Sequence, residues 1–256
     1  MSAGQTGPMV LQQLGLPPQI RACLFDLDGV VTRTAAQHAK AWKTMFDAFL
    51  EQRDGPAFIP FDIATDYVAY VDGKRRLDGT RAFLASRGID LPDGGPADVL
   101  EDHTVQGLSN TKNALVLKVI DAEGVEVFPD AVTYLAALRE AGIPRAVVTS
   151  SANAEQVLTV TKLGEYFDVR VDALVANARG LAGKPAPDTF LAGAQLLDVT
   201  ADQAVVFEDA LAGVEAGRAG AFGLVVGVNR TNQAAQLKAH GADVVVSELT
   251  DLMEKS

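Results

Sequence analysis

Cysteine is nearly absent from this chain of 256 residues: Cys23 stands alone, so no disulfide can form within the chain. Basic residues are also scarce, with 22 lysines and arginines against 33 acidic residues and a formal net charge of −11. Nucleic acids and acidic membrane surfaces favour basic proteins. We therefore expect no nucleic-acid partner and no membrane partner, whereas a phosphorylated small molecule stays compatible with a locally cationic site.

Long hydrophobic stretches are missing as well, and no apolar run approaches the roughly 20 residues of a membrane-spanning helix. Residues 1–17 contain glycine, proline and glutamine, without the basic start and long apolar segment of a secretory signal. We predict a flexible leader over residues 1–17 and a cytoplasmic, monomeric protein. Apolar residues make up 48 % of the chain, which is enough to build a hydrophobic core.

Two carboxylates interrupt an apolar run near the start of the chain. Residues 20–25 have the character of a buried strand, and Asp26 and Asp28 follow two positions apart. Residues at i and i+2 of an extended chain point to the same side, here at the end of a strand where open α/β sheets bind ligands. A bound Mg²⁺ would resolve the cost of burying both charges. The alternative is an Asp-Gly surface turn.

The rest of the chain divides by pattern. After residue 127, short apolar segments alternate with helical ones, which predicts a doubly wound parallel α/β sheet. Strands are expected at residues 146–149, 171–175, 204–207, 223–228 and 243–246. Residues 35–119 instead show helical patterns separated by glycine and proline. We therefore predict an α/β core from residues 18–34 and 120–256, with an inserted helical cap domain from residues 35–119.

Three further polar groups follow expected strands, where ligands bind in such sheets. Thr149 and Ser150 bring hydroxyl groups to the start of an expected helix, where backbone amides are free. Such a group can bind an anion, or it can simply cap the helix. Lys184 precedes a segment stiffened by prolines, which fixes its position unless it is simply solvated. Glu208 and Asp209 suit a hard metal ion or an acidic helix start.

The segment Phe25-Asp26-Leu27-Asp28-Gly29-Val30-Val31-Thr32 resembles the first motif of the haloacid dehalogenase superfamily of phosphotransferases. The resemblance covers about residues 20–250, and the spacing of Thr34, His38 and Trp42 is similar to that of the β-phosphoglucomutase branch. It implies that Asp26 is the nucleophile that becomes an aspartyl phosphate and that Asp28 is the general acid and base.

The same resemblance implies roles for the later groups. Thr149 and Ser150 would bind the transferring phosphate, and Lys184 would neutralise it. Asp26, the backbone carbonyl of Asp28, Asp209 and, directly or indirectly, Glu208 would hold Mg²⁺. Sugar-phosphate contacts are expected from the first helix and the basic positions of the helical domain: Thr34, His38, Trp42, Lys74, Arg75, Arg76 and Lys112. From spacing alone, His38 fits a core position as well as a site.

The implied reaction is the interconversion of β-glucose 1-phosphate and glucose 6-phosphate through glucose 1,6-bisphosphate. Two features depart from the pattern: Arg33 occupies a position that is often acidic, and the loop around Lys74 matches only loosely. Two alternatives therefore stay open. One is a sugar-phosphate phosphatase, and the other is a sensor that binds a sugar phosphate without catalysis.

Overall fold

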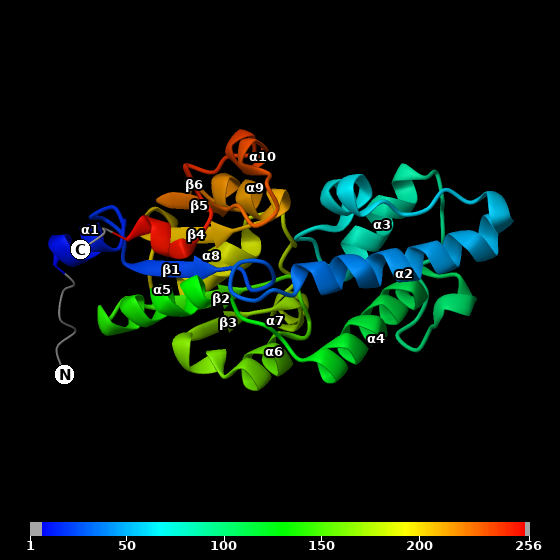
Figure 1. Ribbon diagram of the computed structural model, residues 1–256, viewed down its shortest axis with the longest axis horizontal. Coiled ribbons are helices and arrows are strands. Elements are labelled where there is room, and N and C mark those ends of the chain that lie inside the picture. Colours follow the sequence, from blue (N-terminus) through cyan, green and yellow to red (C-terminus); the bar gives the residue numbers. More distant parts are fainter. Residues whose placement is uncertain (1–6, 254–256) are drawn as a thin grey trace. The chain divides into compact units, whose positions relative to one another are not determined.

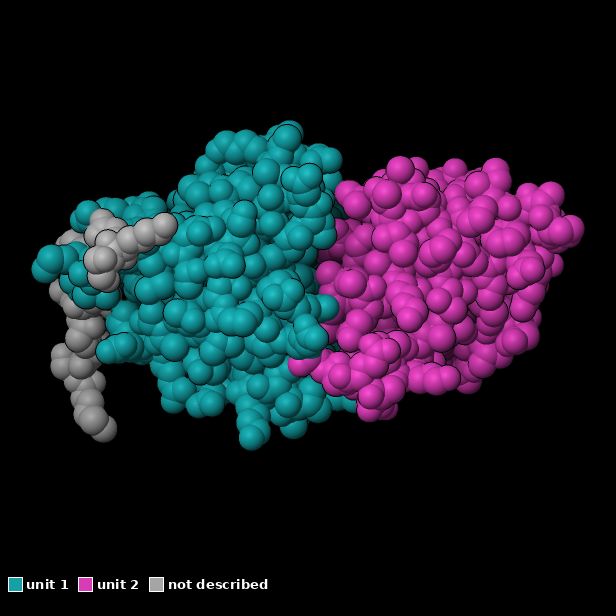
Figure 2. Space-filling model, in the orientation of Figure 1, with its two compact units in different colours: residues 1–33, 126–256 teal, residues 34–125 magenta. Residues whose placement is uncertain are grey.

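The computed structural model describes residues 7–253, and the chain forms two compact units (Figure 2). Of the described residues, unit 1 contains 7–33 and 126–253, and unit 2 contains 34–125. The boundary expected between residues 119 and 120 falls inside a helix, α4 (Val105–Glu123). Within residues 7–253, no helix combines the length and the apolar character that crossing a bilayer requires.

Unit 1 is built on a parallel six-stranded sheet in the order β3-β2-β1-β4-β5-β6 (Figure 1). Its strands are β1 (Ala22–Phe25), β2 (Arg145–Val148), β3 (Val169–Val171), β4 (Ala204–Glu208), β5 (Leu224–Val228) and β6 (Val244–Val246). The doubly wound parallel fold is therefore confirmed. The predicted strand at residues 171–175 is wrong beyond Val171, because the Asp172 carboxylate accepts a hydrogen bond from the Val175 amide (2.9 Å) and starts a helix.

Helices cover both faces of this sheet. They are α5 (Pro129–Glu140), α6 (Ala154–Thr161), α7 (Ala173–Ala178), α8 (Asp188–Leu196), α9 (Leu211–Ala219) and α10 (Ala234–Ala239), with short 3₁₀ turns at η4 (Leu163–Tyr166), η5 (Ala201–Gln203) and η6 (Leu249–Leu252). On one face, Phe190 of α8 packs in a core with Leu24 and Val206. On the other, the Phe25 ring stacks on Phe207 and meets Tyr134 of α5 edge-on.

The prediction of a flexible leader over residues 1–17 is wrong from residue 7 onward, and residues 1–6 lie outside the described part. Helix α1 (Pro8–Gln13) leads into buried Leu14 and Leu16, and Leu11 within it is only 2 % exposed. The Leu14 carbonyl accepts a hydrogen bond from the Tyr134 hydroxyl (2.8 Å). This short segment is ordered because its leucines add to the core of unit 1.

Unit 2 is helical, and no strand occurs in its residues 34–125. It contains α2 (Ala35–Asp54), the 3₁₀ turn η1 (Gly55–Ala57), the π-helix η2 (Ile63–Val71), α3 (Arg76–Ser86), the 3₁₀ turn η3 (Leu100–Asp102) and α4. Its core is aromatic: the Phe46 ring lies 4.1 Å from that of Phe83 and 5.3 Å from that of Phe61, centroid to centroid.

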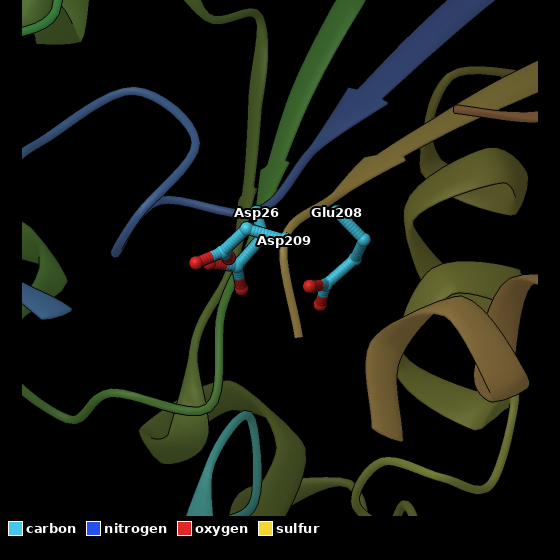
Figure 3. A group of neighbouring side chains, drawn as sticks. All are labelled: Asp26, Glu208 and Asp209. Carbon is cyan, nitrogen blue, oxygen red and sulfur yellow. The ribbon is translucent and has the colours of Figure 1, made fainter. Parts of the chain in front are cut away.

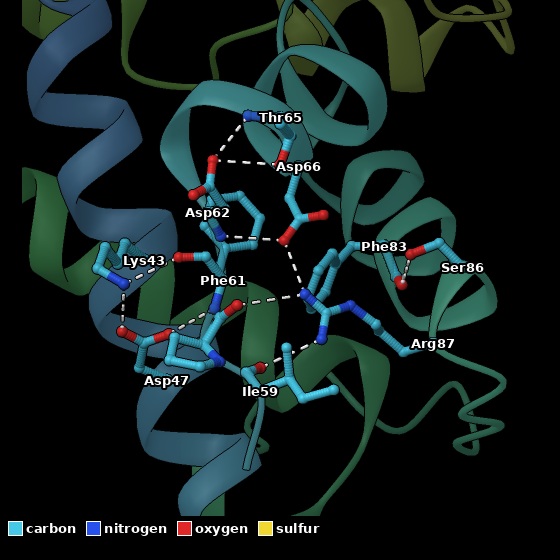
Figure 4. Close-up of polar contacts among 11 residues, drawn as sticks. Lys43, Asp47, Ile59, Phe61, Asp62, Thr65, Asp66, Phe83, Ser86 and Arg87 are labelled. Carbon is cyan, nitrogen blue, oxygen red and sulfur yellow. Dashed lines mark hydrogen bonds and ion pairs between the residues drawn. The ribbon is translucent and has the colours of Figure 1, made fainter.

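Polar contacts hold the segment that precedes η2 against its neighbours (Figure 4). The Asp47 carboxylate of α2 accepts a hydrogen bond from the Phe61 amide (2.7 Å), and Lys43 donates to the Phe61 carbonyl (2.8 Å). Arg87, directly after α3, bonds Asp66 of η2 (2.7 Å) and the Ile59 carbonyl (3.1 Å). These contacts fix the start of η2, whose end leads into the basic loop of unit 2, residues 72–76.

Candidate active site

Lys184 joins the ends of three neighbouring strands of unit 1. Its Nζ lies 2.6 Å from Oδ1 of Asp26 after β1, 2.6 Å from Oε1 of Glu208 in β4 and 3.2 Å from the Val148 carbonyl in β2. The chain order reverses at β1, with β2 on one side and β4 on the other, and doubly wound sheets bind ligands at such a point. The sequence-predicted Asp26, Lys184 and Glu208 therefore meet at the expected edge.

Asp209 completes a cluster of three buried carboxylates with Asp26 and Glu208, and Figure 3 shows their side chains gathered beyond the strand ends. Each offers one oxygen atom, and these oxygens lie within 4.8 Å of one another. An all-oxygen set of this kind suits a hard cation such as Mg²⁺. The cluster does not include the carboxylate of Asp28, whose expected metal contact is the backbone carbonyl.

Burial sets the electrostatics of this cluster. It raises the pKa of Asp26 well above its usual value; Lys184 opposes the rise, and the Glu208 and Asp28 charges add to it. Burial would lower the pKa of Lys184, but the charges of Asp26 and Glu208 outweigh it, so the pKa is raised and the ammonium form persists. The Lys184 ammonium contacts two of the three carboxylates, Asp26 and Glu208, and a divalent cation bound among the three would favour their charged forms.

Two glycines allow backbone to approach the carboxylates closely. A Cβ atom at Gly213 of α9 would lie 1.8 Å from Oε1 of Glu208, and one at Gly29 would similarly overlap Asp209. The backbone carbonyl of Asp209 accepts a hydrogen bond from Nε2 of Gln233 (2.7 Å). Sequence reasoning missed Gly213 and Gln233, because neither belongs to a local motif and their partners are distant in the chain or in another element.

The loop after β1 folds back on itself and carries Asp28 outward. The Thr32 amide and hydroxyl both donate to the Leu27 carbonyl (2.9 and 3.0 Å), and the Gly29 amide donates to the Thr32 carbonyl (2.7 Å). Asp26 is 6 % exposed, whereas Asp28 is half-buried. The two carboxylates predicted as nucleophile and acid/base thus occupy different environments, which suits different roles.

Thr149 follows β2, and its hydroxyl accepts a hydrogen bond from the Ser151 amide (3.1 Å). Thr149 is 2 % exposed and follows Val148, whose carbonyl Lys184 contacts, while Ser150 is half-buried. This placement at the carboxyl edge of the sheet is the one expected for phosphate contacts. The hydroxyl hydrogen of Thr149 stays available, because the Ser151 bond uses an oxygen lone pair.

In unit 2, His38 and Lys112 come together from α2 and α4. The Lys112 Nζ lies 3.0 Å from Nδ1 of His38 and 4.9 Å from the centroid of the Trp42 ring, and Lys112 is 5 % exposed. Trp42 itself is 3 % exposed and stacks on Phe46. Trp42 is therefore a core residue that also supports the Lys112 ammonium through a cation–π contact.

The three basic side chains of the basic loop in unit 2 have different surroundings. Arg75 is engaged by Asp78 (2.6 Å), and Lys74 Nζ lies 3.5 Å from the Ala69 carbonyl. Among residues 7–253, Nε of Arg76 is one of the few buried side-chain atoms without a hydrogen-bond partner. Burial also lowers the pKa of Arg76 from its usual value. Thr34 is buried directly before α2.

Comparisons with known proteins agree with this geometry. A family model for haloacid dehalogenase-like hydrolases matches residues 20–220. The chain is 55 % identical over 246 residues to the β-phosphoglucomutase of Mycobacterium tuberculosis, covering 94 % of each chain. It is 30 % identical to hexitol phosphatase A of Escherichia coli, covering 77 % of each. The solved β-phosphoglucomutase of Clostridium difficile superposes with a TM-score of 0.71 at 26 % identity, covering 92 % of this chain and 94 % of that one.

Proposed function

This chain belongs to the haloacid dehalogenase-like hydrolase family, and we propose that it is a Mg²⁺-dependent β-phosphoglucomutase. It would interconvert β-D-glucose 1-phosphate and glucose 6-phosphate through glucose 1,6-bisphosphate. The observation that carries the proposal is the buried Asp26–Lys184 pair beside Asp209, in a chain 55 % identical to a β-phosphoglucomutase over 94 % of both lengths. We also expect a cytoplasmic monomer.

The residues present fit the expected metal ion. Asp26, Asp209 and the carbonyl of Asp28 would hold Mg²⁺, which when bound would neutralise charge on the phosphate oxygens. Both oxygens of Glu208 already have partners, since Oε1 bonds Lys184 (2.6 Å) and Oε2 accepts from the Ala210 amide (3.0 Å). These contacts favour an indirect role for Glu208, which is to hold Lys184 in place.

Transfer begins when a carboxylate oxygen of Asp26 attacks the phosphorus of a sugar phosphate and forms an acyl phosphate, while Asp28 protonates the departing sugar oxygen. In the reverse direction Asp28 takes the proton of the attacking hydroxyl, and the phosphoryl group leaves Asp26. Lys184, Thr149 and Ser150 stabilise the charge on the phosphoryl oxygens. Transfer to O6 of β-glucose 1-phosphate makes the bisphosphate, and transfer from its O1 releases glucose 6-phosphate.

Unit 2 would supply the contacts to the rest of the sugar. The buried, unpartnered Nε of Arg76 supports binding of the second phosphate, because an anion would satisfy that donor. The His38–Lys112 pair would contact sugar hydroxyls or phosphate, with Trp42 supporting Lys112. Lys74 and Arg75 add positive charge on the same loop, and Thr34 adjoins the start of α2. The buried donor of Arg76 is the strongest of these observations, so Arg76 is the first candidate for the contact to the second phosphate.

A sugar-phosphate phosphatase is the second candidate. The 30 % identity to hexitol phosphatase A supports it, as does Arg33 at a position where the mutases often carry an acid. The two activities share the aspartyl phosphate on Asp26 and differ in whether a sugar hydroxyl or water attacks it.

One assay separates them. β-Glucose 1-phosphate, Mg²⁺ and a trace of glucose 1,6-bisphosphate are supplied, and glucose 6-phosphate and inorganic phosphate are followed together. We expect isomerisation without stoichiometric phosphate, loss of turnover in EDTA, and recovery with Mg²⁺. Asp26→Asn should be inactive, while Asp28→Asn should bind substrate and transfer slowly. Stoichiometric phosphate without isomerisation would replace the mutase by the phosphatase.

A further inference from the structure

The two segments that connect unit 1 to unit 2 are bonded to each other within unit 1. Arg33 is the last residue before unit 2, and Glu126 is the first after it. The Arg33 amide donates to the Glu126 carbonyl (2.9 Å), and the Phe128 amide donates to the Val31 carbonyl (3.0 Å). The outgoing and returning segments thus form a short antiparallel pair.

This pair is continuous with the loop that carries the proposed acid/base. Thr32 lies in the outgoing segment, and both its amide and its hydroxyl bond the Leu27 carbonyl. Thr32 also forms a backbone bridge with Asp28 on one side and with Val127 on the other. Any shift of the paired segments would therefore be transmitted to the backbone of Asp28.

Arg230, in the loop after β5, holds both parts of this assembly. Its guanidinium carbon lies 3.8 Å from the centroid of the Phe128 ring. The same guanidinium donates to the Val30 carbonyl (3.3 Å), to Oδ2 of Asp130 (2.8 Å) and to the Ser247 carbonyl (2.8 Å). Val30 belongs to the loop after β1 that carries Asp28, and Phe128 belongs to the returning segment, so one side chain contacts both.

Arg33 also contacts the Phe128 ring, with its guanidinium carbon 4.5 Å from the centroid, but it is a weaker anchor. Its ion pair with Glu126 is long (3.8 Å), and the two side chains are 51 % and 83 % exposed. Exposed ion pairs of this kind contribute little to the stability of the fold. The side chains of the Arg230–Asp130 pair are only 11 % and 8 % exposed. This buried pair therefore restricts the backbone around it far more strongly than the exposed Arg33–Glu126 pair does.

We propose that Arg230 is a positioning residue for phosphotransfer: by bonding Val30 and packing on Phe128, it fixes the loop that presents Asp28 to the reacting oxygen. The proposal rests on the proposed function for its kinetic consequence. Arg230 does not itself contact Asp26, Lys184 or the acidic cluster in the hydrogen bonds and ion pairs of residues 7–253. Its effect on rate must therefore pass through the loop.

A double-mutant cycle tests that route. Arg230→Lys keeps the positive charge but loses the planar guanidinium that bonds several acceptors at once. If Arg230→Lys folds and leaves kcat unchanged, Arg230→Met is the more disruptive substitution to test next. We expect Arg230→Lys to lower kcat per folded molecule about tenfold and to leave KM for β-glucose 1-phosphate unchanged, since small displacements at a reacting group cost rate. In the Asp28→Asn background the same change should cost less than about twofold. Equal losses in both backgrounds would overturn the proposal.

Hydrogen exchange gives a readout that needs no turnover. In Arg230→Lys, the amides of Arg33 and Phe128 should exchange about tenfold faster, while that of Val206 in β4 stays unchanged. Arg218→Lys, at an exposed ion pair with Asp243 (3.8 Å), is the matched control and should alter neither kcat nor exchange. If the wild type only hydrolyses the sugar phosphate, the mutase assignment fails. The double-mutant cycle is then measured on the rate of phosphate release, so the role of Arg230 is still tested. Unchanged exchange at Arg33 and Phe128 would reject the anchor itself.

Discussion

A Cβ atom at residue 29 would lie 1.9 Å from Oδ2 of Asp209, so Gly29 approaches that carboxylate only because it has no side chain. Its φ of 95° is also one that other residues rarely adopt. Gly29 directly follows Asp28. The loop and the acidic cluster therefore depend on the same glycine for their mutual fit.

We predict that Gly29→Ala lowers kcat by about 100-fold, because either the Asp28 loop or Asp209 must move by a substantial part of an ångström. The measurement is steady-state turnover at saturating substrate and Mg²⁺. Gly164→Ala is the matched control, since a Cβ atom there meets nothing within 4 Å. Equal activity of the two variants would show that the close approach has no catalytic importance.

Removing the cation from the acidic cluster should affect both folding and catalysis. Lys184→Met leaves Asp26 and Glu208 without the ammonium that lies 2.6 Å from each. Breaking a buried pair typically destabilises by about 3–5 kcal/mol, and we expect a loss of this order in the free energy of unfolding together with loss of transfer. Urea unfolding measures it, with exposed Lys40→Met as control. A stable and active Lys184→Met would contradict the role assigned to this pair.

Residues that follow apolar strands were predictable from the sequence, because the carboxyl ends of parallel strands meet at one edge. That rule placed Asp26, Thr149, Glu208 and Asp209 together without any contact information. The position of Lys184 was less determined by local pattern, since it lies in a loop and reaches the site only through tertiary packing.

Two of the failures have local causes, and the third arises from contacts between distant parts of the chain. The third strand ended early because a side chain, Asp172, started a helix inside an apolar stretch. The leader was misjudged because Leu11 and Leu14 give too short a pattern to distinguish a docked helix from a tail. Arg230 could not have been found, since its partners Val30 and Asp130 are 200 and 100 residues away. Such contacts are properties of the folded chain.

A buried hydroxyl offers a test of stability outside the proposed catalytic groups. Thr189 of α8 is 5 % exposed, and within residues 7–253 its Oγ1 has no hydrogen-bond partner. Thr189→Val replaces the unsatisfied hydroxyl with a methyl group, so we expect the free energy of unfolding to rise by about 1 kcal/mol. Thr161→Val is the control, because that hydroxyl donates to the Val157 carbonyl (2.6 Å) and its loss should not stabilise. Equal effects at both positions would contradict this reason.

Cys23 should resist thiol reagents in the folded protein. It is fully buried in β1, and burial raises the pKa of its thiol. The thiolate is the reactive form of cysteine. At a pH near the ordinary thiol pKa of about 8.5, the Cys23 side chain of the native protein is therefore both protonated and shielded from the reagent. We expect negligible iodoacetamide labelling of the native protein and one label per chain in concentrated guanidinium chloride. Rapid native labelling would show that β1 opens or that the thiol is accessible.

Trp42 provides a local reporter for ligand binding to unit 2, because the chain contains only 1 tryptophan. Lys112 Nζ lies 4.9 Å from its ring centroid, so a phosphate attracted to Lys112 alters the charge beside the indole. We predict that glucose 6-phosphate changes the Trp42 emission of the wild type and that Lys112→Met abolishes the change. Lys118→Met, at an exposed position of the same helix, should retain it. A full response in Lys112→Met would place the bound phosphate away from Lys112 and remove that residue from the substrate contacts.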